Sequence, residues 1–209
     1  MVMVKFVRNC GLALLMGGVL LILINTILTP MMLATENEVA MRTSDVYLVR
    51  MSLACVTALL FLFGCIGVHV AQRAIAGAFG SAAFLMAFIG SGLLLALEWS
   101  NLFVLRAVAQ SAPQALELLD RADLMSIGFA SAAGLFALGW LLLAISTWLS
   151  KVLSRRAAIL VIAGFLLIPI LAATPLGPNG MIVGNVVLGL GFILLGLSVM
   201  KAASVMSNH

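Results

Sequence analysis

The sequence predicts an all-α, polytopic membrane protein with six transmembrane helices. Of its 209 residues, 64% are hydrophobic and 9% are charged, whereas soluble domains carry about 25% charged residues. The run from Ala157 to Met200 contains no charged residue. As one straight helix it would reach roughly 66 Å, about twice the hydrocarbon core of a bilayer. The breaker cluster at 174–180, which reads TPLGPNG, therefore divides it into two crossings.

Long charge-free stretches define the helices in order. We expect transmembrane helices over 10–32, 48–70, 75–98, 124–149, 157–174 and 180–201. The first stretch is too long for a cleaved signal peptide, so we expect a retained helix. Thr43 and Ser44 are candidate N-caps for the second helix. The chain is small for a polytopic protein, so we expect residues 1–209 to form a single transmembrane domain.

The connections between these helices alternate in charge. Basic residues mark the N-terminus, the second and fourth turns and the C-terminus: Lys5, Arg8, Arg73, Lys151, Arg155, Arg156 and Lys201. All acidic residues lie on the other side: Glu36, Glu38, Asp45, Glu98, Glu117, Asp120 and Asp123. The positive-inside rule then predicts that both termini are cytoplasmic.

The connection between the third and fourth helices has a helical pattern of its own, over 100–121. Its apolar positions recur at steps of three and four: Leu102, Leu105, Ala109, Ala112, Leu116 and Leu119. The opposite side is polar: Arg106, Gln110, Gln114, Glu117 and Arg121. Ser111 and Gln114 form a capping box around Pro113. We predict two short helices on the outer surface that meet near 111–113. The segment could be a lid, a docking surface or only structural.

The inventory of chemical groups excludes most enzyme classes. The two histidines, His69 and His209, cannot supply two haem ligands within the membrane. The sequence has no H-E-x-x-H zinc motif, P-loop or dinucleotide fingerprint. We expect His69 to be an interfacial residue rather than a proton relay. The cysteines are expected to be buried apolar residues: Cys10, Cys55 and Cys65. We therefore expect no catalytic residue, metal site or cofactor, and the scattered basic residues indicate no nucleic-acid binding.

Polar side chains gather in the outer half of the predicted bundle. The candidate polar cluster is Asn25, Arg50, Glu98 and Asn185. Arg50 and Glu98 lie at similar depth on consecutive antiparallel helices, so they could pair directly. Two interpretations are open. Both residues could lie at the interface and help to set the helix ends, or all four could line an outward-facing polar cavity.

Small residues four apart occur on several predicted helices. They are Gly180-x-x-x-Gly184, Ala76-x-x-x-Gly80 and Ala130-x-x-x-Gly134. Such spacing lets helix backbones approach closely. We expect these faces to pack within the chain, with dimerisation as the alternative.

Two segments carry a family resemblance. Residues 98–113 read EWSNLFVLRAVAQSAP, and residues 135–166 read LFALGWLLLAISTWLSKVLSRRAAILVIAGFL. Together they resemble a group of bacterial six-helix integral membrane proteins of unknown function. The chain departs from that group at Ser154, where we would expect a proline before the arginines. The resemblance implies the fold and a bacterial inner (plasma) membrane, and it implies no activity.

The leading hypothesis is an inner-membrane protein without catalytic machinery that serves as an accessory or assembly subunit. Its partners would be the lipid bilayer and a larger membrane complex. The alternative is a small-solute transporter or channel with an outward-facing polar cavity. An enzyme acting on lipid comes third, because no pair of nucleophile and base is visible.

Overall fold

The computed structural model describes residues 2–35, 37–120, 123–175 and 177–206, and every regular element within them is a helix. The elements are α1 (Val2–Leu23), η1 (Ile24–Leu28), α2 (Thr29–Leu33), α3 (Glu38–Thr43), α4 (Asp45–Trp99), η2 (Ser100–Leu105), α5 (Arg106–Ser111), α6 (Gln114–Asp120), α7 (Asp123–Ser150), α8 (Arg155–Ala172) and α9 (Pro178–Met206). Five helical stretches of this described part are long and apolar enough to cross a membrane. The predicted all-α fold is confirmed.

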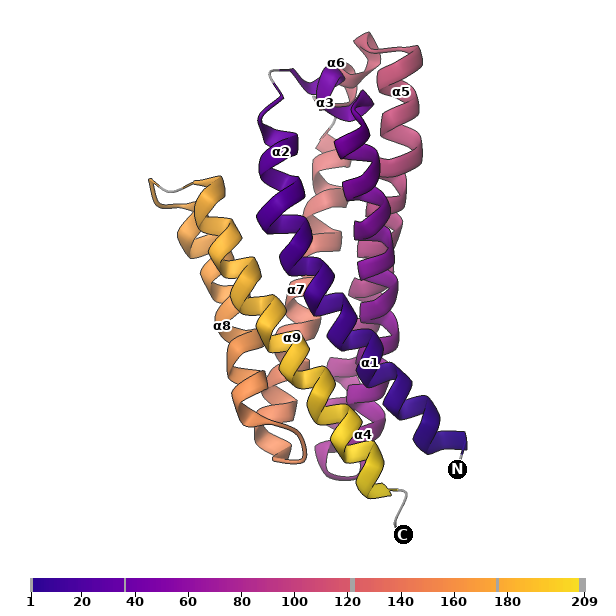
Figure 1. Cartoon of the computed structure of the whole chain (residues 1–209), viewed down its shortest axis with the longest axis vertical. Coiled ribbons are helices and arrows are strands. Elements are labelled where there is room, and N and C mark those ends of the chain that lie inside the picture. Colours follow the sequence, from indigo (N-terminus) through magenta and orange to yellow (C-terminus); the bar gives the residue numbers. More distant parts are fainter. Residues whose placement is uncertain (1, 36, 121–122, 176, 207–209) are drawn as a thin grey trace.

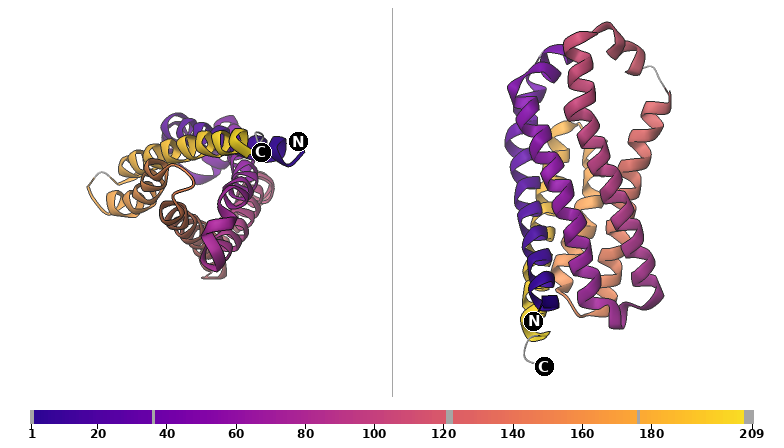
Figure 2. Two further views of the ribbon diagram at one scale, coloured as in Figure 1. Left: turned by 90° about the horizontal axis from the view of Figure 1, so that it is seen from below. Right: turned by 90° about the vertical axis from the view of Figure 1, so that its right-hand side faces the viewer.

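The longest helix, α4, folds back on itself at Gly77. This residue has φ 59° and ψ −153°, a conformation that is open in practice only to glycine. The hydroxyl of Tyr47 donates to the carbonyl oxygen of Asn101 at 3.1 Å, although 54 positions separate the two residues. His69 stacks on Phe84 with ring centroids 4.3 Å apart. The element is therefore two antiparallel arms, residues 45–76 and 78–99, seen side by side in Figure 2.

The observed boundaries differ from the predicted ones in two places. The first helix begins at Val2 rather than near residue 10, because residues 2–9 contain no helix breaker. The reversal expected at 71–74 lies at Gly77 instead, since the helix continues through Arg73. Charge favours a membrane boundary at Arg73, but the backbone can reverse only where its dihedral angles allow it. Ser44 is the N-cap of the first arm, accepting from the backbone N–H of Tyr47 at 3.1 Å.

The segment after α4 was expected to lie across the end of the bundle, but its first half instead prolongs the second arm. Through η2 and α5 the helix continues to Ser111, and it breaks at Ala112, with φ −147° and ψ 62°. This break lies at the predicted junction, and α6 follows it. The apolar residues Leu102, Leu105 and Ala109 are buried as the pattern indicates, and α5 packs against α3. Residue 121 and the side chains of residues 117, 119 and 120 lie outside this description.

The helices form a bundle in which sequence-distant elements lie side by side. Helix α1 packs against α9 and α4, α7 packs against α4 and α8, and α8 packs against α9. Both termini lie at one end (Figure 1), together with the reversal at Gly77 and the α7–α8 turn. We call this the basic end, because Lys5, Arg8, Arg73, Lys151, Arg155, Arg156 and Lys201 gather there. The other end, with α3, α5 and α6, is the acidic end.

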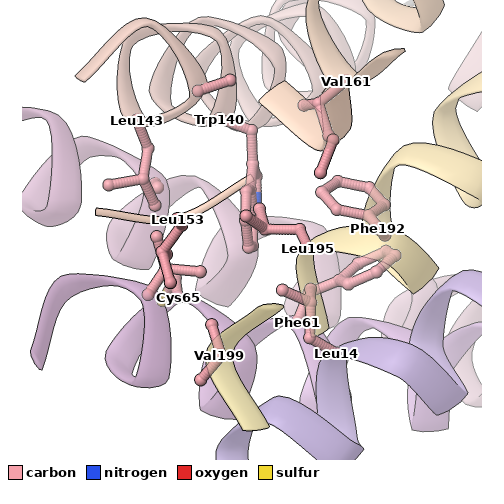
Figure 3. Packing of buried hydrophobic residues seen from close by; sticks show 14 of the residues in the cluster. Leu14, Phe61, Cys65, Trp140, Leu143, Leu153, Val161, Phe192, Leu195 and Val199 are labelled. Atoms are coloured by element: carbon pink, nitrogen blue, oxygen red, sulfur yellow. The ribbon is translucent and has the colours of Figure 1, made fainter. Parts of the chain in front are cut away.

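Aromatic rings fill the centre of the bundle. Phe61 lies 4.6 Å from Phe192 and 6.0 Å from Trp140, measured between ring centroids. The Trp140 indole N–H donates to the Ser91 hydroxyl at 3.0 Å, so this buried polar group is paired. Figure 3 shows Trp140, Phe61, Phe192 and their neighbours converging from several helices. This core joins both ends of the chain to α4 and α7.

Glycine allows two of the helices to approach closely. A Cβ atom built on Gly18 would lie 2.6 Å from the Gly189 carbonyl oxygen, and one on Gly11 would lie 2.9 Å from that of Gly196. These pairs repeat every seven residues along the antiparallel α1 and α9. Of the faces expected from sequence, Gly184 packs on α8. Gly134 faces open space, with no heavy atom within 4 Å of a built Cβ.

Candidate functional site

A polar pocket lies near the acidic end, between α2 and the first turns of α9, which stand apart in Figure 1. Its volume is about 600 Å³, within the range of small-molecule sites. It is lined by Asn25, Thr29, Pro30, Leu33, Ala34, Arg50, Asn179, Met181, Ile182 and Asn185. The structure thus brings together three members of the predicted cluster, Asn25, Arg50 and Asn185.

A local irregularity of the first helix shapes one wall of this pocket. Pro30 has no N–H group, and its ring would clash with the carbonyl four residues earlier in a regular helix. The chain responds with the π-helical turn η1, where the backbone N–H of Thr29 bonds to the carbonyl of Ile24. Such π turns are frequent at functional sites. Here the turn carries Asn25, and Thr29 follows it directly, so both side chains reach the pocket.

The two asparagines face the pocket with their acceptors free. The Asn25 amide nitrogen donates to the carbonyl of Leu21 at 2.8 Å, and that of Asn185 donates to Met181 at 2.9 Å. One N–H group of each side-chain amide is thus held by its own helix. The side-chain carbonyl oxygens have no partner in the described part of the chain, so they can accept from a ligand or water.

Among the described residues that line this pocket, Arg50 is the one that carries a charge. Its Nε donates to the Thr29 hydroxyl at 3.2 Å, and one terminal nitrogen contacts the sulfur of Met51 at 3.2 Å. A guanidinium carries five N–H donors, and these two acceptors are neutral. No carboxylate of the described residues lies within 4.0 Å of Arg50. Among the described residues Arg50 thus forms no direct ion pair, and its guanidinium keeps free N–H donors that suit a planar anionic group.

Glu98, the fourth predicted member, does not line the pocket. The side chain of Arg50 bonds to Thr29 instead, so the direct ion pair considered from the sequence is not formed. The groups that act on the Glu98 carboxylate are Arg50 and the side chain of Asn101. One carboxylate oxygen, Oε2, is buried without a hydrogen-bond partner among the described residues. Glu98 thus stays within electrostatic range of Arg50 from the opposite arm of α4.

A second polar network fastens the acidic end of the α4 hairpin, and sequence reasoning missed it. Arg42 forms an ion pair with Glu38 at 2.5 Å and donates to the Tyr47 hydroxyl at 3.2 Å. Burial disfavours the charge of Arg42, but these two partners outweigh it and raise its pKa above the ordinary arginine value. Arg106 donates to the backbone carbonyl of Ser44 at 2.6 Å and to that of Arg42 at 3.1 Å. The two contacts of Arg106 join positions more than 60 residues apart, so no local sequence pattern reveals them.

The remaining polar residues give no sign of catalysis. In the part of the chain described, no three His, Cys, Asp or Glu residues could share a metal ion. His69 packs against Phe84, and its Nδ1 is buried without a hydrogen-bond partner among the described residues. Gln72 and Ser146 are buried near the basic end, each with one polar atom unpaired there. All three cysteines are free thiols, with Cys10 and Cys65 buried.

Comparison of the chain with protein-family models, curated proteins and solved structures finds no match. The resemblance to six-helix bacterial membrane proteins therefore stays a prediction, and functional argument must come from the geometry described above.

Proposed function

We propose that the chain crosses the bacterial inner membrane six times, with both termini in the cytoplasm. Each arm of α4, together with η2 and α5 for the second, is longer than the roughly 20 residues that a crossing needs. Counting the arms separately adds one crossing to the five apolar helical stretches. The basic residues gather at the end that carries the termini, which supports a cytoplasmic location by the positive-inside rule.

Cysteine labelling tests this topology. In a cysteine-free background, single cysteines at the exposed residues Asn37 and Asn179 should react with an impermeant thiol reagent added to intact cells. A cysteine at exposed Lys151 should react only after the membrane is opened. Labelling at Lys151 but not at Asn179 in intact cells would reverse the orientation.

We propose further that the protein binds a small anionic solute from the outer side, as part of a transporter or channel. The observation that carries this proposal is Arg50, which has no carboxylate of the described residues within 4.0 Å and lines a pocket of about 600 Å³. Charged residues within a membrane protein are costly unless they are paired, hydrated or functional. The free carbonyl oxygens of Asn25 and Asn185 would accept hydrogen bonds from hydroxyl or amide groups of the same solute. No catalytic role is part of this proposal.

A melting-temperature series in mild detergent tests the binding. Acetate, benzoate and inorganic phosphate are the anionic probes, with acetamide and ethylammonium as neutral and cationic controls. At 100 times its dissociation constant a ligand stabilises the native state by about 2.7 kcal/mol, which is several degrees for a chain of this size. The rise should be absent in Arg50→Gln and retained in Arg8→Gln, which removes an exposed charge at the basic end. An equal rise in Arg50→Gln would contradict the proposal.

A second candidate function is the accessory or assembly subunit, and the acidic-end half of α7 favours it. Residues 126–131 are exposed at six consecutive positions, so every face of the helix is open there. A Cβ atom on Gly128 or Gly134 would have no heavy atom within 4 Å. Ala130 and Gly134 are small residues four apart, a spacing that allows a partner helix to approach closely. A photo-crosslinking residue at Ser131 should then capture a defined partner in native membranes, whereas one at exposed Leu166 on α8 should not. Equal capture at both positions would refute this role.

A further inference from the structure

A second pocket lies at the basic end, between the α7–α8 turn and α9. Its volume is about 530 Å³. Ser154, Ser198 and Lys201 supply its polar lining, and Leu194, Leu197 and Val205 are apolar residues on the exposed surface of α9. One cavity thus combines a polar group of hydrogen-bond donors with an apolar surface that continues along a helix long enough to span a membrane.

The charge around this pocket has one sign. Lys201 lies in its lining, and Arg155 and Arg156 are exposed in the first turn of α8, directly after the lining residue Ser154. All the acidic side chains of the described residues belong to the acidic end of the bundle. The basic residues have no acidic side chain at their own end to neutralise them, so the pocket is complementary to an anion.

The hydroxyl groups of the pocket are positioned as donors. The backbone N–H of Ser154 donates to the Ser198 Oγ at 2.9 Å, which fastens the turn to α9. The Ser154 Oγ accepts from the backbone N–H of Ala157 at 3.4 Å. Each oxygen thus accepts a hydrogen bond from the protein, and neither hydroxyl hydrogen has an acceptor in the described part of the chain. Two O–H groups and the ammonium of Lys201 remain to donate, and a phosphate oxygen is a strong acceptor for all three.

We propose that this pocket binds an acidic phospholipid. The headgroup phosphate contacts Lys201, Ser154 and Ser198, and an acyl chain follows Leu194 and Leu197 along α9. A lipid fits better than a soluble phosphate, because the donors open onto an apolar strip rather than into a closed polar cavity. A zwitterionic lipid fits less well, because its own amine would meet Arg155 and Arg156. This inference is independent of the solute proposed for the pocket at the acidic end.

Native mass spectrometry of the full chain tests the proposal. The protein is reconstituted in an equal mixture of phosphatidylcholine and phosphatidylglycerol, extracted in mild detergent, and scored for retained lipid. Wild-type protein should retain phosphatidylglycerol in preference to phosphatidylcholine. Lys201→Gln should weaken this retention about tenfold, equivalent to about 1.4 kcal/mol, Lys201→Arg should restore most of it, and Ser198→Ala should weaken it by a smaller factor.

Lys5→Gln is the matched control, since it removes one exposed charge from the same end outside the pocket. If Lys5→Gln and Lys201→Gln lose equal amounts of retained phosphatidylglycerol, the lipid is held by diffuse electrostatic attraction and the proposed site is wrong. Equal retention of the two lipids by wild-type protein would also overturn it, as would full competition by inorganic phosphate alone. If Lys201→Gln does not fold, Ser198→Ala and Lys201→Arg are the variants that test the proposal. Unchanged retention in Ser198→Ala would then count against the assigned contacts.

Discussion

The close packing of α1 on α9 can be tested by adding one methyl group. In Gly18→Ala the new Cβ would lie 2.6 Å from the Gly189 carbonyl oxygen and 2.9 Å from the backbone nitrogen of Ile193. Both neighbours are backbone atoms, so neither can rotate away. Because ordinary contacts lie near 3.5–4.0 Å, α9 must withdraw by roughly 1 Å, and such a gap removes about a quarter to a half of the dispersion energy at the contact.

The expected magnitude follows from two opposing effects. Overpacking a tight contact costs about 1–3 kcal/mol, while replacing glycine by alanine in a helix gains about 0.4–1 kcal/mol through the unfolded state. We expect Gly18→Ala to lower the free energy of unfolding by about 1–2 kcal/mol, which lowers the melting temperature by about 2–8 °C. Gly134→Ala is the matched control, because its Cβ would meet no atom within 4 Å. It should leave the melting temperature unchanged or raise it by a few degrees.

The buried thiols offer the readout. Cys10 and Cys65 are buried free cysteines, so a fluorogenic maleimide reacts with them as the protein unfolds in detergent on heating. If Gly18→Ala and Gly134→Ala have the same melting temperature, the close α1–α9 contact is refuted. A larger loss in Gly189→Ala, whose Cβ would lie 2.5 Å from the Ile22 side chain and 2.8 Å from the Gly18 carbonyl oxygen, would agree with it.

Three further predictions use the same melting assay. Gly77→Ala should lower the free energy of unfolding by about 1–3 kcal/mol. The backbone conformation alone causes this loss, since a Cβ there meets nothing within 4 Å. An effect as small as that of Gly92→Ala would argue against the reversal at Gly77. Tyr47→Phe should cost about 1 kcal/mol by removing the hydroxyl shared by Arg42 and Asn101, and unchanged melting would mean that this network does not fasten the hairpin. A double-mutant cycle of Trp140→Phe and Ser91→Ala should give a coupling of about 0.6 kcal/mol and at most about 1.7 kcal/mol, whereas zero coupling would contradict their hydrogen bond.

Composition and breaker residues predict much of this fold, because the membrane limits the choice of structure. A backbone without water must satisfy its own hydrogen bonds, so long apolar runs become helices. The cluster at 174–180 separates two helices as expected: α8 ends at Ala172, just before it, and α9 begins at Pro178, within it. The reversal in α4 was placed too early because Arg73 is a charge signal, whereas the bend needs the dihedral freedom of Gly77. The segment at 100–111 shows a similar limit: periodicity predicts its buried face, but does not reveal that it prolongs the preceding helix.

Three of the four predicted members of the candidate site line one pocket, and Glu98 and the predicted pairing do not follow the prediction. Asn25, Arg50 and Asn185 were chosen because polar residues are costly in a membrane, and all three line the pocket. Thr29, which accepts from Arg50, lies at the end of a π turn that the sequence signals only through Pro30. The partner of an arginine depends on which helix faces it, and this is a tertiary property. The Arg42–Tyr47–Asn101 contacts escaped prediction for the same reason.

The length of α8 places the Arg50 pocket relative to the membrane. Its 18 residues rise about 27 Å, close to the full thickness of the hydrocarbon core. In the six-crossing topology proposed above, the ends of α8 therefore lie near the two boundaries of that core. Gly184 packs against Ile168, four residues before α8 ends at Ala172, which is about 6 Å of helix rise. Asn185 follows Gly184, so the pocket floor lies inside the boundary rather than above it.

In this topology, the depth favours one of the two interpretations that the sequence left open for Arg50. An arginine at the boundary could extend its side chain into water and need no partner. Arg50 instead turns toward Thr29 and shares a pocket with Asn185, one helical turn below the end of α8. A charge held there requires water or an anion beside it. Glu98 interacts with this charge from the opposite arm of α4 without forming an ion pair, and the anion series with Arg50→Gln asks whether a solute anion also binds beside it.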